Sequence, residues 1–356
     1  MNGKRAMRRH TTRRTHVRHA GGMLVLCCAP GSSATMGKGQ IKHLLAKTQR
    51  QQRLSQPVDI SSSTLSCLPQ NTQLYFRGFS ELRQVASWMS EALECAGERL
   101  SATEECHVKL TPPGEAWPPA SQYRDLSACR EELFARRPHH TTCRGINATL
   151  HYEWKSRMWS EYDATFHRRL VEAASSSSAP VLAILNGGPH HFNHLQGHDH
   201  GLHHSVPDSF AFPQQWFDDY LEGANALFAA FSPRTLPANV CVLWRTSNVG
   251  PRLGVQARQT PLTAHHPSAR NGFHDWLNRW SAALARKAGI GVVDLDDITS
   301  AVTPRSPDGS VDMYHGFNSS LVLEPFVARA CAACSPSWKR ASGSRGARRL
   351  LSAHAA

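Results

Sequence analysis

The chain has 356 residues, and its 40 Lys and Arg against 27 Asp and Glu give a formal net charge of +13 at pH 7. The excess charge lies at the two ends, because residues 1–57 hold 12 basic side chains and residues 335–356 hold 5, with no acidic residue in either stretch. The middle carries 23 basic against 27 acidic side chains. A folded nucleic-acid-binding face needs basic residues interleaved with aromatic ones, so this distribution disfavours a nucleic-acid partner.

Residues 1–56 are expected to be a basic leader, either a targeting segment or a disordered one. The apolar run Met23–Ala29 follows a basic stretch and resembles the core of a secretory signal, with an organellar transit peptide as the alternative. Sequons at Asn147 and Asn318 agree with a secretory route to the Golgi lumen or the cell exterior. No apolar run approaches the roughly 20 residues that cross a bilayer. Residues 335–356 are predicted to be a basic disordered tail.

The ten cysteines are distributed over the whole chain. Three of them lie in a Pro-rich, strand-poor insertion at residues 97–143, where bridges help to order a segment with little core of its own: Cys106, Cys129 and Cys143. Cys241 lies inside an apolar strand and is predicted to be a free buried thiol. Cys331 and Cys334 have the spacing of a thioredoxin motif, but they follow an apolar helix instead of opening one, which disfavours a redox role.

A serine lies between the first predicted strand and the first predicted helix. Residues 73–76 are expected to form a strand, residues 77–79 a tight turn, and residues 81–95 an amphipathic helix. Ser80 would then lie where unpaired backbone N–H groups and the helix dipole favour an oxyanion. The alternative is that Ser80 only caps the helix.

From Val181 onward, short apolar runs alternate with longer amphipathic ones, which predicts a parallel sheet covered by helices on both faces. The expected strands are 181–185, 240–244 and 290–295, and the expected helices are 214–231, 272–288 and 319–333. A further strand is predicted at 152–154.

Polar residues follow the predicted strands. Ser80 follows the first, Asn186 and Gly187 follow the strand at 181–185, and Arg245 follows the next one. Because ligands bind beyond the carboxyl ends of parallel strands, these groups are expected to converge on one edge of the sheet. Arg245 is a candidate substrate contact, with pairing to a loop carboxylate such as Asp297 as the alternative.

Asp312 and His315 lie three residues apart in a Gly/Pro-rich loop after the last predicted strand. A carboxylate at this spacing can accept a hydrogen bond from Nδ1 of the imidazole and leave Nε2 free to take a proton from a nucleophile. Together with Ser80 they are predicted to form a Ser-His-Asp site.

The blocks around Ser80, Asn186, Arg245 and His315 resemble, in their order and spacing, those of the SGNH (GDSL-type) hydrolase superfamily, and most of all its PC-esterase branch of polysaccharide O-acetyltransferase-like proteins. The resemblance covers roughly residues 70–334. It implies a three-layer α/β/α fold, with Ser80 as nucleophile, His315 as base, Asp312 as orienting group, and an oxyanion hole of Ser80, Asn186 and Gly187. The implied activity is esterase or O-acyltransferase chemistry on a carbohydrate or other O-acylated substrate, with an acyl donor in the transferase case and no cofactor. Phe79 departs from the family pattern, which has Asp before the serine.

A histidine-rich tract at 189–204 supplies the main rival interpretation. Seven imidazoles and one carboxylate within sixteen residues are ligands that Zn²⁺ or Cu²⁺ would accept, although their spacing matches no helix-borne metal motif. We expect a His-rich loop at the cleft without a metal, with His190 near the strand end as a substrate contact. A catalytically inactive carbohydrate-binding protein of the same fold is the third possibility.

Overall fold

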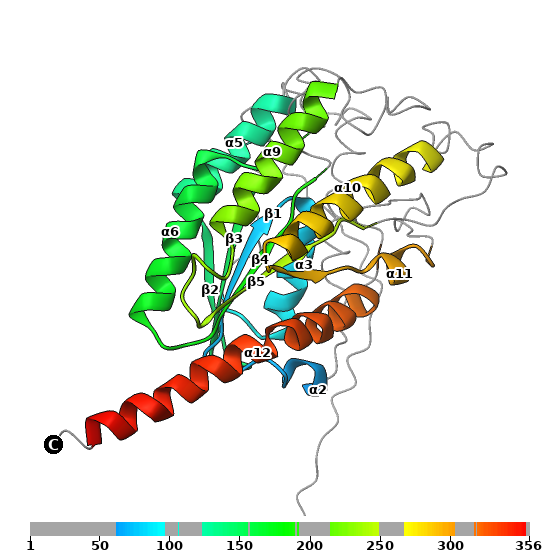
Figure 1. Cartoon of the computed structure of the whole chain (residues 1–356). Helices are drawn as coiled ribbons and strands as arrows, with labels where there is room; N and C mark the ends of the chain where they lie inside the picture. The colour runs from blue at the N-terminus through cyan, green and yellow to red at the C-terminus, as the bar shows by residue number, and fades with distance from the viewer. Residues whose placement is uncertain are drawn as a thin grey trace, which may run out of the picture. The chain divides into compact units, whose positions relative to one another are not determined.

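A computed structural model of the chain is shown in Figure 1. It describes residues 62–96, 106, 123–155, 157–188, 191, 214–248, 267–302, 317 and 319–353. All of these residues belong to one unit that spans Lys38–Ala356. No helix among them is both long and apolar enough to cross a bilayer.

The centre of this unit is a six-stranded sheet with the strand order β2-β3-β1-β4-β5-β6. Every neighbouring pair is parallel except β2 with β3, so β2 is an antiparallel edge strand. The strands are β1 Gln73–Gly78, β2 His139–Cys143, β3 Ala148–Trp154, β4 Val181–Leu185, β5 Val240–Arg245 and β6 Gly291–Val293. All five residues of β4 are buried, which is typical of a central parallel strand covered on both faces.

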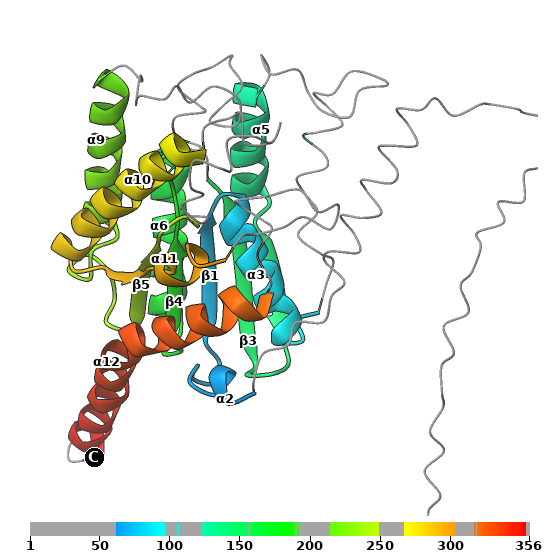
Figure 2. The same ribbon diagram turned by 90° about the vertical axis from the view of Figure 1, so that its right-hand side faces the viewer.

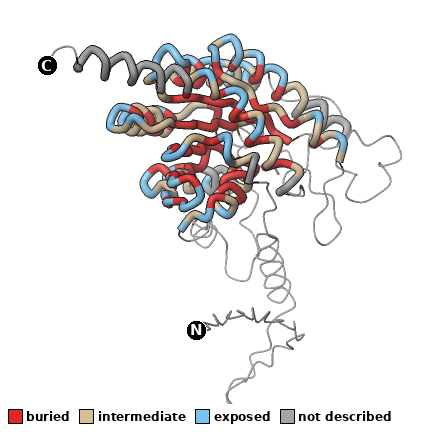
Figure 3. Tube along the Cα trace, turned by 90° about the horizontal axis from the view of Figure 1, so that it is seen from below, coloured by how far each residue is buried: buried red, intermediate tan, exposed pale blue. Residues whose placement is uncertain are grey.

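Helices cover both faces of the sheet, so the molecule has the three α/β/α layers that the sequence predicts (Figure 2). Alternate residues of a strand lie on opposite faces of the sheet and belong to two separate hydrophobic cores. Leu182 and Ile184 of β4 pack under α3 and α12, and Ala183 and Leu185 pack under α6, α9 and α10. The buried strands run between two partly exposed helical layers in Figure 3. The helices are α2 Ser62–Leu65, α3 Ser80–Ala92, α5 Tyr123–Arg136, α6 Glu161–Ser176, α9 Gln214–Ala230, α10 Pro267–Lys287, α11 Asp296–Thr299 and α12 Ser319–Ala353.

The elements predicted from periodicity are present in order, but α6 was not predicted. Its buried stripe is narrow, with Phe166, Leu170 and Ala174 among charged residues. A start signal was nevertheless present, because Ser160 and Asp163 form a reciprocal capping box at its amino end.

The assignment of residues 97–143 as a strand-poor insertion is wrong for its second half. Residues 123–136 form α5, and residues 139–143 form β2 at the edge of the sheet. Only Thr141 and Cys143 of β2 are buried, so this edge strand lacks the apolar run that marks an interior strand.

Four disulfides are formed among the described cysteines: Cys67–Cys331, Cys95–Cys143, Cys106–Cys129 and Cys241–Cys334. The prediction that Cys241 is a free thiol is wrong, because α12 brings Cys334 onto β5. Cys331 and Cys334 pair with different partners and not with each other, so they do not form a thioredoxin-type pair. Four bridges match a protein of an oxidising compartment, secreted or extracellular.

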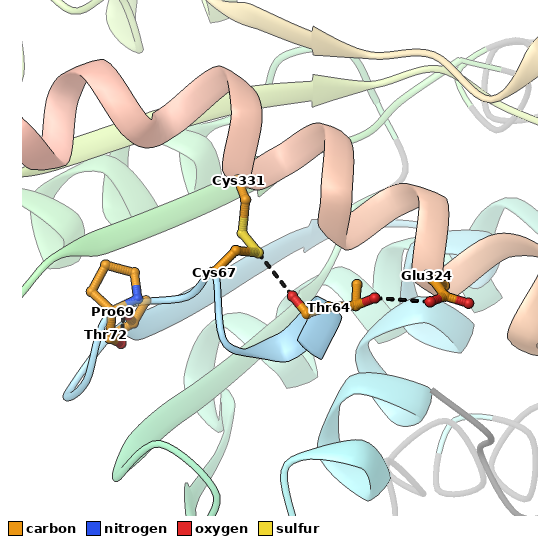
Figure 4. Close-up of a disulfide and its surroundings, with 6 residues drawn as sticks. All are labelled: Thr64, Cys67, Pro69, Thr72, Glu324 and Cys331. Atoms are coloured by element: carbon orange, nitrogen blue, oxygen red, sulfur yellow. Dashed lines mark hydrogen bonds between the residues drawn. A yellow bond between two sulfur atoms is a disulfide. The ribbon is translucent and has the colours of Figure 1, made fainter. Parts of the chain in front are cut away.

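Side chains in the first half of helix α12 connect it to the body of the protein. In Figure 4 the Cys67–Cys331 bridge and a hydrogen bond from Thr64 Oγ1 to Glu324 (2.8 Å) join it to the segment before β1. Farther along the chain, Cys334 reaches β5. The helix continues to Ala353, so the segment predicted as a disordered tail is helical. Extending an anchored helix requires no new nucleation, and Ala and Arg are strong helix formers.

Candidate functional site

The strand order places a topological switch point between β1 and β4. From β1 the chain moves to β2 and β3 on one side of the sheet and then returns to β4, β5 and β6 on the other. Ligands of open α/β sheets bind in the crevice outside the carboxyl ends of the strands at such a point. Ser80 follows β1 and Asn186 follows β4, so two of the predicted site residues lie at this place.

Ser80 is the first residue of α3 and is half-buried. Phe79, in an extended conformation, precedes the helix, and its side chain has no oxygen with which to cap it. The interpretation of Ser80 as a simple cap is therefore not supported, because the capping position is one residue earlier. The amino end of α3 directs backbone N–H groups and the positive end of the helix dipole toward this point, which favours negative charge beside the Ser80 hydroxyl.

The turn from β1 into α3 packs directly against Asn186. A Cβ atom at Gly78 would lie 2.7 Å from Cδ2 of Leu82 and 3.0 Å from Cβ of Asn186. Only glycine allows this close approach. The turn that carries Ser80 and the residue after β4 are consequently in contact.

Asn186 is fully buried, and its position is set by two hydrogen bonds and by its contact with Gly78. Its backbone N–H donates to the carbonyl of Arg77 (3.1 Å), and its side-chain Nδ2 donates to the carbonyl of Arg245 (2.9 Å). One Nδ2 proton is thus engaged, and an amide carries two. Gly187 follows it in a tight place, where a Cβ would lie 2.8 Å from Sδ of Met158, and Gly188 has φ +145°.

The structure assigns Arg245 an internal role instead of the predicted substrate contact. The side chain is buried, and its Nη1 pairs with Oε2 of Glu81 at 3.0 Å. Its Nη2 donates to Oδ1 of Asn248 at 2.6 Å. Arg245 therefore pairs with a carboxylate, as the alternative prediction states, but the partner lies in α3 and not in a loop. The predicted partner, Asp297, pairs instead with Arg329 of α12 (2.7 Å).

A second buried ionic group, absent from the sequence analysis, lies below the end of β1. The Arg77 guanidinium contacts the carboxylates of Asp163 (2.7 Å), Glu131 (3.2 Å) and Glu153 (3.4 Å). Lys155 Nζ lies 2.6 Å from Asp163. The signal was Arg77 itself, a charged residue directly after the apolar residues 74–76 of the predicted strand. This group ties the end of β1 to α5, β3 and α6, so the strand that precedes Ser80 is rigidly held.

In this group, burial and the neighbouring opposite charges shift the pKa values in opposite directions. Burial alone would lower the pKa of Arg77, but the carboxylates of Asp163, Glu153 and Glu131 raise it above its ordinary value. Burial raises the pKa of Asp163, and Arg77 and Lys155 more than compensate, so the net shift is downward. Burial lowers the pKa of Lys155 and raises that of Glu153. Loss of one partner would leave uncompensated charge in the interior.

Three predicted site residues, Asp312, His315 and His190, lie outside the described residues. Of the histidine tract, only His191 is described. It is buried, its Nδ1 accepts a hydrogen bond from the backbone N–H of Met158 (3.2 Å), and its Nε2 lies 3.3 Å from Asp219. Within the described part of the chain, no cluster of three or more His, Cys, Asp or Glu side chains is arranged to hold a metal ion.

Comparison with known proteins gave structural likenesses only. No family model and no curated protein matches the sequence. Among solved structures, the extracellular lipase from Streptomyces rimosus is 12% identical over 74% of this chain and 99% of its own, with a TM-score of 0.39. The acetylxylan esterase Axe2 from Geobacillus stearothermophilus is 12% identical over 74% of this chain and 95% of its own, with a TM-score of 0.36. LAE5, an alpha/beta hydrolase enzyme from the metagenome of Lake Arreo in Spain, is 13% identical over 74% and 97%, with a TM-score of 0.33.

These TM-scores lie below 0.5, so the classification of the chain rests on its own strand order and layers. The chain is a three-layer α/β/α protein with a mostly parallel sheet. At the switch point of that sheet, a serine opens a helix beside a buried asparagine.

Proposed function

We propose that the chain is a serine-dependent acyl-ester hydrolase or O-acyltransferase of the SGNH type. The observation that carries the proposal is the position of Ser80. It opens α3 at the switch point of the sheet, and the turn that leads to it contacts Asn186, the proposed oxyanion donor. An N-cap role would account for a serine one position earlier, where Phe79 lies.

The proposed chemistry has two steps. His315, oriented by Asp312, takes the proton of the Ser80 hydroxyl, whose oxygen attacks the carbonyl carbon of the ester. His315 returns the proton to the leaving alcohol, and an acyl-enzyme remains on Ser80. In the second step, water or a sugar hydroxyl attacks the acyl carbon while His315 takes its proton. The bond between the acyl carbon and Ser80 Oγ then breaks, and His315 returns the proton to that oxygen.

The oxyanion of each tetrahedral intermediate would be held by N–H groups at the end of β4 and the start of α3. The proposed donors are the backbone N–H groups of Ser80 and Gly187 and the Nδ2 proton of Asn186 that Arg245 leaves unused. Donors fixed in place before the reaction stabilise the developing charge without reorganisation, and loss of one typically costs about 10²- to 10³-fold in kcat.

Within this class we propose O-acetylated carbohydrate as the substrate and the secretory pathway, Golgi lumen or cell exterior, as the location. The substrate rests on the resemblance of the Ser80, Asn186, Arg245 and His315 blocks to the PC-esterase branch. The location is supported by the four disulfides and by the basic leader. Hydrolase and transferase share the acyl-enzyme, and the acceptor that enters the cleft decides between them.

Labelling with a serine-reactive fluorophosphonate tests the proposal. We expect the full chain to be labelled, Ser80→Ala to be unlabelled and His315→Ala to be labelled at a strongly reduced rate. Ser87→Ala is the matched control, because Ser87 lies on the same helix and its hydroxyl donates to the Arg83 carbonyl (2.9 Å). Ser87→Ala should be labelled like the wild type.

Two outcomes identify the rival functions. Sugar binding without any labelling indicates a catalytically inactive carbohydrate-binding protein. Stoichiometric metal that survives dialysis, with an activity that a chelator abolishes and Ser80→Ala leaves intact, indicates a metal-binding protein built on the histidine tract.

A further inference from the structure

The residue directly after Ser80 is a buried carboxylate. Glu81 is 1% exposed, although it lies in the first turn of α3. Its Oε2 accepts hydrogen bonds from Nη1 of Arg245 (3.0 Å) and from the backbone N–H of Asn248 (2.9 Å). Arg245 is also 1% exposed, and its Nη2 reaches Oδ1 of Asn248. The first turn of α3 is thereby attached to the carboxyl end of β5.

The same arginine also holds Asn186. The carbonyl oxygen of Arg245 accepts the hydrogen bond from Nδ2 of Asn186 (2.9 Å). The backbone N–H of Asn186 donates in turn to the carbonyl of Arg77 on β1, the strand that leads into Ser80. The contacts therefore close a ring that runs from α3 through Glu81, Arg245 and Asn186 back to β1.

This ring joins the two groups that the proposed function needs in register, the nucleophile and the oxyanion donor. A buried ion pair contributes little to stability on balance, because the cost of removing both charges from water offsets their attraction. The location of the Glu81–Arg245 pair next to Ser80 is better explained by a role in fixing the position of the start of α3. Phe79 supplies no capping oxygen, so the carboxylate of Glu81 supplies a polar side-chain anchor for the start of α3.

We propose that Glu81 and Arg245 are positioning residues that hold the Ser80 hydroxyl in register with the Asn186 amide. The inference rests on the proposed function and extends it to a pair that touches neither substrate nor the reacting atoms. Displacement of a reacting group by about 1 Å costs on the order of 10²-fold in rate. Removal of a residue that orients a functional side chain typically lowers activity by about 10- to 100-fold.

Two variants distinguish an effect on the position of Ser80 from an effect on the stability of the fold. Arg245→Lys keeps a positive charge near Glu81, but its single ammonium cannot reproduce the fork between Glu81 and Asn248. The double variant Glu81→Leu with Arg245→Met removes both charges together, a change that often leaves a buried site as stable as before. Asn239→Ala is the matched control, because Asn239 precedes the other end of β5 and donates to the carbonyls of Ala174, Ser177 and Ala179.

The measurements are kcat and KM for p-nitrophenyl acetate, the rate of fluorophosphonate labelling and the melting temperature, all on the full chain. We expect both variants to lose about 10- to 100-fold in kcat and in labelling rate, with KM within about twofold of the wild type. The melting temperature of the double variant should stay near that of the wild type. Asn239→Ala should show the reverse, a lower melting temperature with kcat unchanged.

Wild-type kcat in Arg245→Lys and in the folded double variant would overturn the positioning role. A loss of kcat that follows the fraction of unfolded protein would overturn it as well. If Ser80→Ala is inactive in either case, the proposed function stands without this inference. An activity that survives Ser80→Ala refutes the proposed function and the positioning role together.

Discussion

Replacement of Gly78 by alanine should damage stability and reactivity together. The new Cβ would lie 2.7 Å from Cδ2 of Leu82 and 3.0 Å from Cβ of Asn186, which is closer than carbon atoms pack. Leu82 and Asn186 are both fully buried, so neither has free space to move into. Overpacking of this kind costs about 1–3 kcal/mol. Each kcal/mol lowers the melting temperature by about 2–4 °C in a domain of roughly 150–250 residues, and by less in a larger one.

The functional part of this prediction follows from the same two distances. If Asn186 moves by a few tenths of an ångström and α3 moves with Leu82, the Ser80 hydroxyl and the proposed oxyanion donors lose register. We expect the rate of fluorophosphonate labelling to fall by about 10-fold or more in Gly78→Ala. Thermal melting and labelling kinetics on one preparation measure both effects.

Gly145→Ala provides the control for Gly78→Ala. Gly145 lies in the turn before the amino end of β3, whereas Ser80 follows the carboxyl end of the parallel strand β1. A Cβ at Gly145 would lie 3.4 Å from its nearest neighbour, the Leu93 carbonyl oxygen. This variant should keep the wild-type labelling rate. Gly78→Ala with the melting temperature and the labelling rate of the wild type would show that the turn does not pack against Asn186 as described.

Three further predictions concern the scaffold. Burial and the neighbouring His140 lower the pKa of His151 to about 3 from an ordinary 6.5, so below pH 6.5 the unfolded chain binds a proton that the folded one does not. Stability should therefore fall by at most about 1.4 kcal/mol per pH unit as the pH falls from 6.5. Urea unfolding at pH 7 and pH 5 measures this fall, and an equal fall in His151→Phe would contradict it. Arg77→Met should cost about 3–5 kcal/mol, because it leaves three buried carboxylates without their shared cation; a urea midpoint close to that of the wild type would refute this. Mild reduction followed by alkylation and mass spectrometry should modify Cys67 and Cys331 before Cys241 and Cys334, because Cys67 is exposed and the second bridge is buried; simultaneous modification would count against the order.

The alternation of apolar runs and helical periods was sufficient to predict the sheet and the layers. Residues such as Val181–Leu185 are apolar without interruption, and a strand of that kind is stable only between two covering layers. The position of Ser80 at the junction of β1 and α3 followed from the same local pattern. Edge elements were harder to predict, since β2 and α6 bury only a few of their residues and their sequences are mixed.

The local sequence pattern could not predict which side chains, far apart along the chain, pair with each other. Asp297 and Glu81 both carry a carboxylate, and nothing in the sequence around Arg245 distinguishes the two as partners. The order of strands β1, β4 and β5 brings α3 over the end of β5, and that arrangement selects Glu81. In the same way, the path of α12 across β5 pairs Cys241 with Cys334 and Cys331 with Cys67, pairings that spacing along the chain does not reveal.

By itself, the sequence determined the interior strands, the helices with a broad apolar face, the parallel class of the sheet and the residues at the carboxyl ends of its strands, because apolar periodicity and turn residues act over a few neighbouring positions. Only the tertiary structure decided that Arg245 faces inward to Glu81, that Arg77 gathers three carboxylates, and that Asn186 touches the turn before Ser80. These contacts join residues 54 to 164 positions apart, and the choice among chemically equivalent partners at such separations depends on how the layers pack.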